Sequence, residues 1–205
     1  MAYPTPAEFA DVLCLKLVLA SGSPRRALLL ATAGYPHEVR IPAVDETPIE
    51  DESAAETVLR LSELKARAVG RETGEVAVAA DTMVVLEGKR LGKPSDPADA
   101  RRMLTSLNGR THSVLTGWTV LSDEAPRFGV SESRVTFKEL SQDDIHRYVT
   151  DTDSLDFAGA YGIHVDRGRL IAHVRGSRAN VMGLPLRDVV EALEDLGIER
   201  SAPNG

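Results

Sequence analysis

The sequence Leu15-Lys-Leu-Val-Leu-Ala-Ser-Gly-Ser-Pro-Arg-Arg26 places an apolar run directly before a short polar loop. The apolar half is typical of a buried strand, and residues 25–33 have a helical pattern. Backbone N–H groups at the start of a helix attract anions, and Ser21, Arg25 and Arg26 add directed donors suited to phosphate oxygens. The stretch therefore predicts a strand, a phosphate-binding loop and a helix.

The same loop also has a purely structural interpretation. Ser23-Pro24 is a common helix start, with a serine cap and proline at the first helical position, and both arginines would then be solvated. Neither Gly-x-x-x-x-Gly-Lys-Ser/Thr nor Gly-x-Gly-x-x-Gly occurs, so a P-loop and a dinucleotide-binding Rossmann unit are not indicated. The loop alone leaves both interpretations open.

Beyond this loop the chain alternates unevenly between strand-like and helix-like segments. Further strands are expected at 37–41, 76–86, 111–121, 130–137 and 170–174. Further helices are expected after the capping residues Ser53, Asp96 and Ser141 and over 186–196. This order favours an α/β or α+β fold, a mixed sheet flanked by helices, over a strictly parallel doubly wound sheet.

The segment Val76-Ala-Val-Ala-Ala-Asp-Thr-Met-Val-Val-Leu86 holds one carboxylate inside an apolar strand. Burial of Asp81 without a partner would cost several kcal/mol, and an open cleft or a bound metal would remove that cost. Asp81 is therefore a candidate site residue, and it supports the phosphate-binding interpretation of the loop. The alternative is an aspartate that caps a turn at the end of the strand.

Three other charged residues could join Asp81. Lys93 follows the strand and its turn, so its ammonium could return to face an anion. Glu46, in the acidic loop 42–52, could give a divalent cation a second carboxylate. Lys65 lies on the helix that Ser53 caps. Solvated positions are the more common outcome for all three types of residue, so each is weak evidence by itself.

Length and composition limit the kind of protein. The chain has 205 residues, a mass of 22.1 kDa and a formal charge of −7, which favours one domain and argues against a nucleic-acid partner. No stretch approaches the roughly 20 apolar residues of a membrane span, and no signal peptide is evident. The lone Cys14 excludes an internal disulfide and suits a buried position in a reducing, cytoplasmic protein. We expect an N-terminal extension over 1–14, a domain over 15–198 and a tail over 199–205.

Eight short blocks occur in order along the chain: Leu17-Val-Leu-Ala-Ser-Gly-Ser-Pro-Arg-Arg26, Val44-Asp-Glu-Thr47, Leu61-Ser-Glu-Leu-Lys-Ala-Arg67, Ala80-Asp-Thr82, Leu91-Gly-Lys-Pro94, Leu107-Asn-Gly-Arg-Thr-His112, Ala158-Gly-Ala-Tyr-Gly-Ile163 and Asn180-Val-Met-Gly-Leu-Pro185. Together they resemble the Maf-like nucleotide pyrophosphatases over nearly the whole predicted domain. The resemblance implies a Maf/ITPase-like mixed sheet with a central nucleotide cleft. It also implies hydrolysis of a nucleoside triphosphate to the monophosphate and pyrophosphate, with a divalent cation, Mg²⁺ or Mn²⁺.

The resemblance assigns roles to matching residues. Asp81 matches the proton acceptor, and Glu46 with Asp81 matches the acidic pair that binds the metal. The matching substrate-binding residues are Ser21, Arg25, Arg26, Lys65 and Lys93. A triphosphate can bind a chain of charge −7 if the basic groups gather in one cleft and a metal neutralises the remainder.

Within the family, Arg25, Thr82 and residues 158–162 resemble the branch that acts on dTTP and UTP. The chain departs from the pattern at Phe157, where the family commonly has lysine, and at His164, where it commonly has glutamine. A glutamine amide offers a donor and an acceptor side by side, whereas a neutral imidazole carries them on opposite sides of its ring. His164, if it meets the base, should therefore loosen the pyrimidine preference. It could instead face the sheet or solvent.

Two other functions stay open at this stage. A non-catalytic nucleotide-binding regulator of cell division would use the same cleft without turnover. A phosphomonoesterase would release orthophosphate in place of pyrophosphate. The sequence also leaves a homodimer open.

Overall fold

The computed structural model describes residues 15–201, so the predicted extension 1–14, with Cys14, and residues 202–205 lie outside the described part. Within it, seven strands form one sheet: β1 (Lys16–Ala20), β2 (Glu38–Arg40), β3 (Glu75–Leu86), β4 (Lys89–Leu91), β5 (Thr111–Leu121), β6 (Arg127–Phe137) and β7 (Ile171–Arg175). The α-helices are α1 (Pro24–Thr32), α2 (Ala54–Ala68), α3 (Pro97–Leu107), α4 (Gln142–Asp151), α5 (Arg178–Val181) and α6 (Leu186–Glu194). Two short 3₁₀ helices follow α4, namely η1 (Ser154–Asp156) and η2 (Ala158–Ala160).

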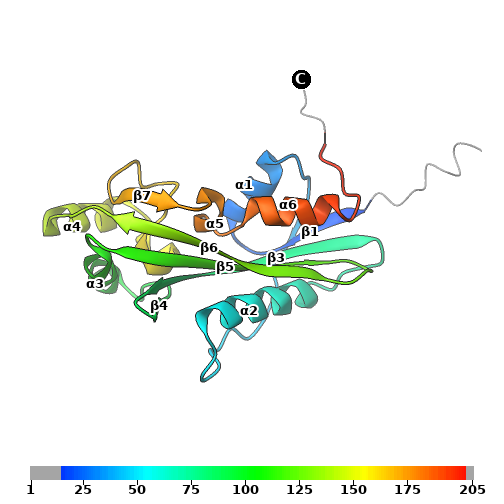
Figure 1. Cartoon of the computed structure of the whole chain (residues 1–205), viewed down its shortest axis with the longest axis horizontal. Coiled ribbons are helices and arrows are strands. Elements are labelled where there is room, and N and C mark those ends of the chain that lie inside the picture. The colour runs from blue at the N-terminus through cyan, green and yellow to red at the C-terminus, as the bar shows by residue number, and fades with distance from the viewer. Residues whose placement is uncertain (1–14, 202–205) are drawn as a thin grey trace, which may run out of the picture.

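The sheet is mixed, as predicted. Its strand order is β2-β1-β3-β5-β6-β7, with β4 paired to β3. Strand β1 runs parallel to β2 and to β3, whereas every other pair in the sheet is antiparallel. The long strands β3, β5 and β6 form a continuous twisted ribbon along the molecule (Figure 1).

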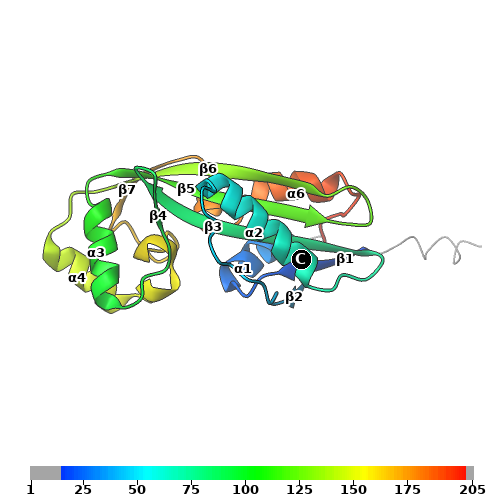
Figure 2. The ribbon, with the colours of Figure 1, turned by 90° about the horizontal axis from the view of Figure 1, so that it is seen from below.

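Helices cover both faces of this ribbon. Helix α2 packs on one face, against β3 and β5, and α1 and α6 lie on the opposite face (Figures 1 and 2). Val76 and Val78 of β3 belong to the core on the α1 and α6 side, while Ala79 packs with Ala66 of α2. Because both faces of β3 are buried, the strand reads as a nearly continuous apolar run.

A second core occupies the other end of the sheet. Helices α3 and α4 lie there, away from α2 and β1 (Figure 2). Leu104, Ile145 and Tyr148 from these helices pack with Phe137 of β6 and with Tyr161. Within residues 15–201, no helix combines the length and apolar character that a membrane span requires.

The predicted helix starts are confirmed by their caps. The Ser53 hydroxyl accepts the Glu56 N–H, and the Glu56 carboxylate accepts the Ser53 N–H, which completes a capping box. Asp96 accepts two backbone N–H groups at the start of α3. Strand β6 begins at Arg127, three residues before the prediction, and α5 was not predicted at all. A helix of four residues is too short to show a periodic pattern.

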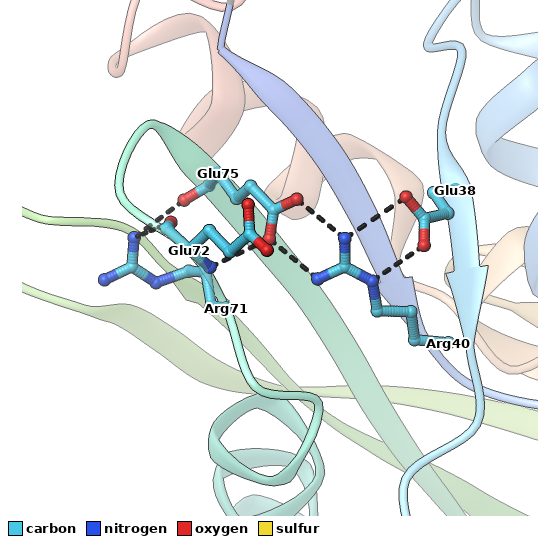
Figure 3. Close-up of polar contacts among 5 residues, drawn as sticks. All are labelled: Glu38, Arg40, Arg71, Glu72 and Glu75. Carbon is cyan, nitrogen blue, oxygen red and sulfur yellow. Dashed lines mark hydrogen bonds and ion pairs between the residues drawn. The ribbon is translucent and has the colours of Figure 1, made fainter.

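A network of charged residues joins β2 to the start of β3 (Figure 3). Arg40 donates to both carboxylate oxygens of Glu75, at 2.7 Å each, and also to Glu38. Arg71 donates to the Glu75 carbonyl at 2.9 Å, and the Glu72 N–H donates to the Glu75 carboxylate. The hydrogen bond from Arg40 lowers the pKa of Glu75 to about 2. Glu75 is buried, so these bonds keep its charge paired while they hold the short strand β2 in place.

Candidate functional site

The predicted phosphate loop joins β1 to α1, and it lies in a cleft of about 860 Å³. The cleft is bounded by this loop, α2 and β3 on one side and by residues of the 91–93 turn and the 156–164 segment on the other. Ser23 has the backbone conformation of a helix cap, yet its side chain makes no capping hydrogen bond within the described residues. Donors at the start of α1 are therefore left for another acceptor.

Arg26 is held in place by neutral acceptors. Its Nε–H donates to the Gly183 carbonyl at 2.7 Å, and its two terminal nitrogens donate to the hydroxyls of Ser21 at 3.1 Å and Thr82 at 3.2 Å. No carboxylate pairs with it among residues 15–201, and burial lowers the pKa of Arg26 although Asp81 and Glu46 partly oppose this. A guanidinium has five N–H donors, so two are left for an anion. The interpretation in which both arginines are solvated is wrong for Arg26.

Asp81 lies in the middle of β3 opposite Gly117 of β5, so the interpretation as a turn cap is wrong. Its side chain is buried, and its Oδ1 accepts a hydrogen bond of 2.6 Å from Lys65 Nζ. The same ammonium lies 2.9 Å from Glu46 Oε1. Asp81 lines the cleft, as expected, and the ion pair with Lys65 further offsets the cost of burying its charge.

Lys65 is buried, whereas local sequence context favoured a solvated position on the helix surface. Only 8% of its surface is exposed, because the capped start of α2 aligns this face of the helix with β3. It thereby joins the acidic loop 42–52 to the strand through Glu46 and Asp81. Residue type and local context favoured a surface position for this lysine, and only its place in the block Leu61–Arg67 indicated the site.

The two carboxylates could hold a divalent cation only together with another ligand. Within residues 15–201, no three histidine, cysteine, aspartate or glutamate side chains come close enough to hold a metal by themselves. Mg²⁺ is commonly bound by one or two carboxylates together with substrate phosphates and waters. Glu46 and Asp81, which converge on one ammonium, match that donor set.

The other predicted residues also reach the cleft. Thr82 supports Arg26 and shares a hydrogen bond of 3.1 Å with the Thr116 hydroxyl. Lys93 and His164 are both exposed, and both line the cleft. Arg90, Asp156 and Phe157 line it too, although the sequence did not assign them to the site. Five basic side chains and three acidic ones thus face the cleft of a chain with charge −7, which focuses positive potential there.

His112 contacts Tyr161, one of the residues that line the cleft. Its Nε2 is hydrogen-bonded to the Tyr161 hydroxyl at 2.7 Å, and both rings pack edge-to-face with each other and with Phe137. His112 Nδ1 has no partner within the described residues. Burial lowers the pKa of His112 to about 4.

We expect stability to fall as the pH drops from about 6.5 to 4. Unfolded His112 takes up a proton near pH 6.5, about its ordinary pKa, whereas the folded side chain does so only near 4. Between these values the unfolded state binds more protons, so up to about 1.4 kcal/mol is lost per pH unit. Urea unfolding at several pH values should show a steeper dependence for the parent than for His112→Gln. If the unfolding free energy of the parent and of His112→Gln depended equally on pH, His112 would not be the group responsible.

The model of the Maf-like protein family matches residues 16–196. The dTTP/UTP pyrophosphatase of Vibrio vulnificus (strain YJ016) is 45% identical over 182 residues, 88% of this chain and 98% of that protein. The dTTP/UTP pyrophosphatase of Moorella thermoacetica is 46% identical over 189 residues, 90% of this chain and 96% of that protein. Among solved structures, a HAM1 protein from Coxiella burnetii aligns with 88% of this chain and 99% of that chain, at a TM-score of 0.47 and 19% identity.

The match covers the phosphate loop, the acidic pair and the 156–164 segment in one continuous alignment to the family model. The relatives are matched over nearly their whole length. This chain therefore belongs to the Maf-like protein family.

Proposed function

We propose that this chain hydrolyses dTTP, UTP and related nucleoside triphosphates to the nucleoside monophosphate and pyrophosphate. The observation that carries the proposal is the arrangement of the cleft: Arg26, a partly buried cation paired with no carboxylate in the described part, lies in the same cleft as Asp81. The first group suits an anionic phosphate chain and the second suits the activation of water. The names of the relatives and the resemblance at Arg25, Thr82 and 158–162 support dTTP and UTP as substrates.

In the proposed reaction, water attacks the α-phosphorus. A bond forms between the water oxygen and the α-phosphorus, and the bond to the oxygen that bridges to the β-phosphate breaks, so its electron pair leaves with pyrophosphate. Asp81 accepts the proton of the water. Its Oδ1 is bonded to Lys65, and Oδ2, which has no hydrogen bond within the described residues, is the oxygen available for this proton.

Charge on the departing pyrophosphate is stabilised by Arg25, Arg26, Lys93 and the start of α1. Arg26 is in place before the substrate arrives, because Gly183, Ser21 and Thr82 already hold its guanidinium. Glu46 and Asp81 would hold a divalent cation, Mg²⁺ or Mn²⁺. When bound, such a cation polarises phosphoryl oxygens as a Lewis acid.

The proposal is tested by incubating the purified chain with dTTP, UTP, CTP and GTP and measuring pyrophosphate and orthophosphate separately. We expect pyrophosphate and monophosphate in equal amounts, with the highest kcat/KM for dTTP or UTP. Release of orthophosphate from monophosphates would indicate a phosphomonoesterase. Binding of triphosphates without product would support the non-catalytic regulator of cell division. A cytoplasmic location stays a prediction of the sequence, and a homodimer stays open.

Arg26→Ala should weaken triphosphate binding by about 1.5 to 3 kcal/mol, the range for a hydrogen bond to a charged group. The Gly183 carbonyl also loses its donor, so the melting temperature should fall, and binding must be measured by calorimetry well below it. Arg102→Ala is the matched control, because Arg102 is exposed on α3 and pairs only with Asp99 in the described structure. If the two variants bound the triphosphate with equal affinity, Arg26 would have only a structural role.

A further inference from the structure

Phe157 and His164, the two positions where the sequence departs from the Maf-like pattern, are in direct contact. Their ring centroids lie 5.3 Å apart with the rings nearly perpendicular, at 88°. Gly162 permits this approach, because a Cβ there would lie 2.8 Å from His164 Cε1 and 3.0 Å from the Phe157 ring. Both rings line the cleft on the 156–164 side.

The Phe157 ring also contacts the phosphate loop. The guanidinium carbon of Arg25 lies 4.8 Å from the centre of this ring, which is a cation–π contact. Unlike Arg26, Arg25 makes no side-chain hydrogen bond or ion pair within residues 15–201. The Phe157 ring is thus a direct contact of this guanidinium, while burial lowers the pKa of Arg25 and the charge of Asp156 partly opposes that shift.

The segment that carries Phe157 is itself anchored. The Gly159 N–H donates to the Gly92 carbonyl at 2.9 Å, next to Lys93. Gly159 has a positive φ of 69°, and a Cβ at this position would lie 3.2 Å from the Val84 side chain, so the turn sits closely against β3. Phe157 is 7% exposed and has little freedom to move. A rigid ring thus reaches Arg25 from the opposite wall of the cleft.

We propose that Phe157 is a positioning residue for Arg25, which it holds over the cleft so that the guanidinium N–H groups point at the phosphates of the substrate. This rests on the proposed function, since it takes Arg25 as a phosphate ligand. The buried ring has its face toward Arg25 and a ring contact with His164, so it acts on the substrate through Arg25 and not as a stacking surface for the base.

The test is a double-mutant cycle on the binding of the α,β-imido analogue of UTP, which cannot be hydrolysed to pyrophosphate. In the parent, Phe157→Leu should weaken binding about 3- to 10-fold, the fold-change that corresponds to a cation–π contact of modest strength. In an Arg25→Ala background the same change should have less than about a twofold effect. Phe157→Tyr, which keeps the ring, should bind as the parent does.

A purely structural role of Phe157 predicts a different result. Phe157→Leu would then weaken binding by the same factor with and without Arg25, and this outcome would overturn the proposal. Phe137→Leu is the control, because it removes a buried ring that contacts His112 and Tyr161 and shows no contact with Arg25 in the described structure. It should show no coupling to Arg25→Ala. Phe157→Met replaces Phe157→Leu if the latter does not fold.

The cycle also separates this proposal from the proposed function. Equal effects of Phe157→Leu in both backgrounds, with tight binding by the parent, would refute the positioning role and leave the function standing. Failure of the parent to bind the analogue would refute both. If Phe157→Leu and Arg25→Ala are coupled in binding but the parent chain does not hydrolyse UTP, the positioning role is supported and the proposed enzymatic function is contradicted.

Discussion

Asp81→Asn is expected to lower kcat for UTP or dTTP by a factor of about 100 or more, with the fold unchanged. The amide keeps the size of the side chain and can still accept a hydrogen bond from Lys65. It cannot take a proton from water, and it removes one of the two negative charges that face the Lys65 ammonium. Steady-state pyrophosphate release at saturating Mg²⁺ or Mn²⁺ measures the effect.

Asp45→Asn is the matched control for this experiment. Asp45 neighbours Glu46 in the same acidic loop, but it is exposed, bonds to Thr47 and does not line the cleft. Its kcat should stay within about twofold of the parent value. Wild-type turnover by Asp81→Asn would remove Asp81 from the role of proton acceptor, provided that its melting temperature matches that of the parent.

Gly117→Ala should destabilise the fold more than any other change considered, by about 3 kcal/mol or more. Helix α2 crosses β5 so closely that a Cβ at position 117 would lie 2.2 Å from the Val58 carbonyl oxygen. The obstructing atoms belong to the helix backbone, so a change of rotamer cannot relieve the clash, and α2 would have to move with Lys65 on it.

Gly92→Ala serves as the comparison for Gly117→Ala. A Cβ at position 92 would meet no atom within 4 Å, and Gly92 does not have a positive φ. Urea unfolding should therefore place the Gly92→Ala variant within about 1 kcal/mol of the parent. A similar small effect at Gly117 would show that α2 tolerates displacement from β5.

The sequence predicted the elements of this fold where a local signal exists. The capping box at Ser53, the cap at Asp96 and the long apolar run of β3 each occur where predicted. The four-residue α5 is too short to show such a signal, and the start of β6 lies three residues before the predicted one. Tertiary contacts with neighbouring strands, which no local pattern records, establish these segments.

In the site, too, local sequence signals indicated some residues, whereas contacts between distant segments could not be predicted. Ser21, Arg26 and Asp81, which line the cleft, were candidates from residue type and local context, although the loop alone left a structural interpretation open. The Lys65 ion pair could not, because it depends on how α2 crosses β3. Nor could the contact of Phe157 with Arg25, since it joins the 156–164 segment to the first helix across the cleft. Contacts between distant segments are decided by packing, which periodicity does not reveal.

The proposed reaction requires that water attacks the α-phosphorus, and one isotope experiment tests this step most directly. UTP is hydrolysed by the parent chain in water enriched in oxygen-18, and the products are separated and analysed by mass spectrometry. Attack at the α-phosphorus predicts one labelled oxygen in the phosphate of UMP and none in pyrophosphate. Label in pyrophosphate or in released orthophosphate, with unlabelled nucleotide, would contradict the account.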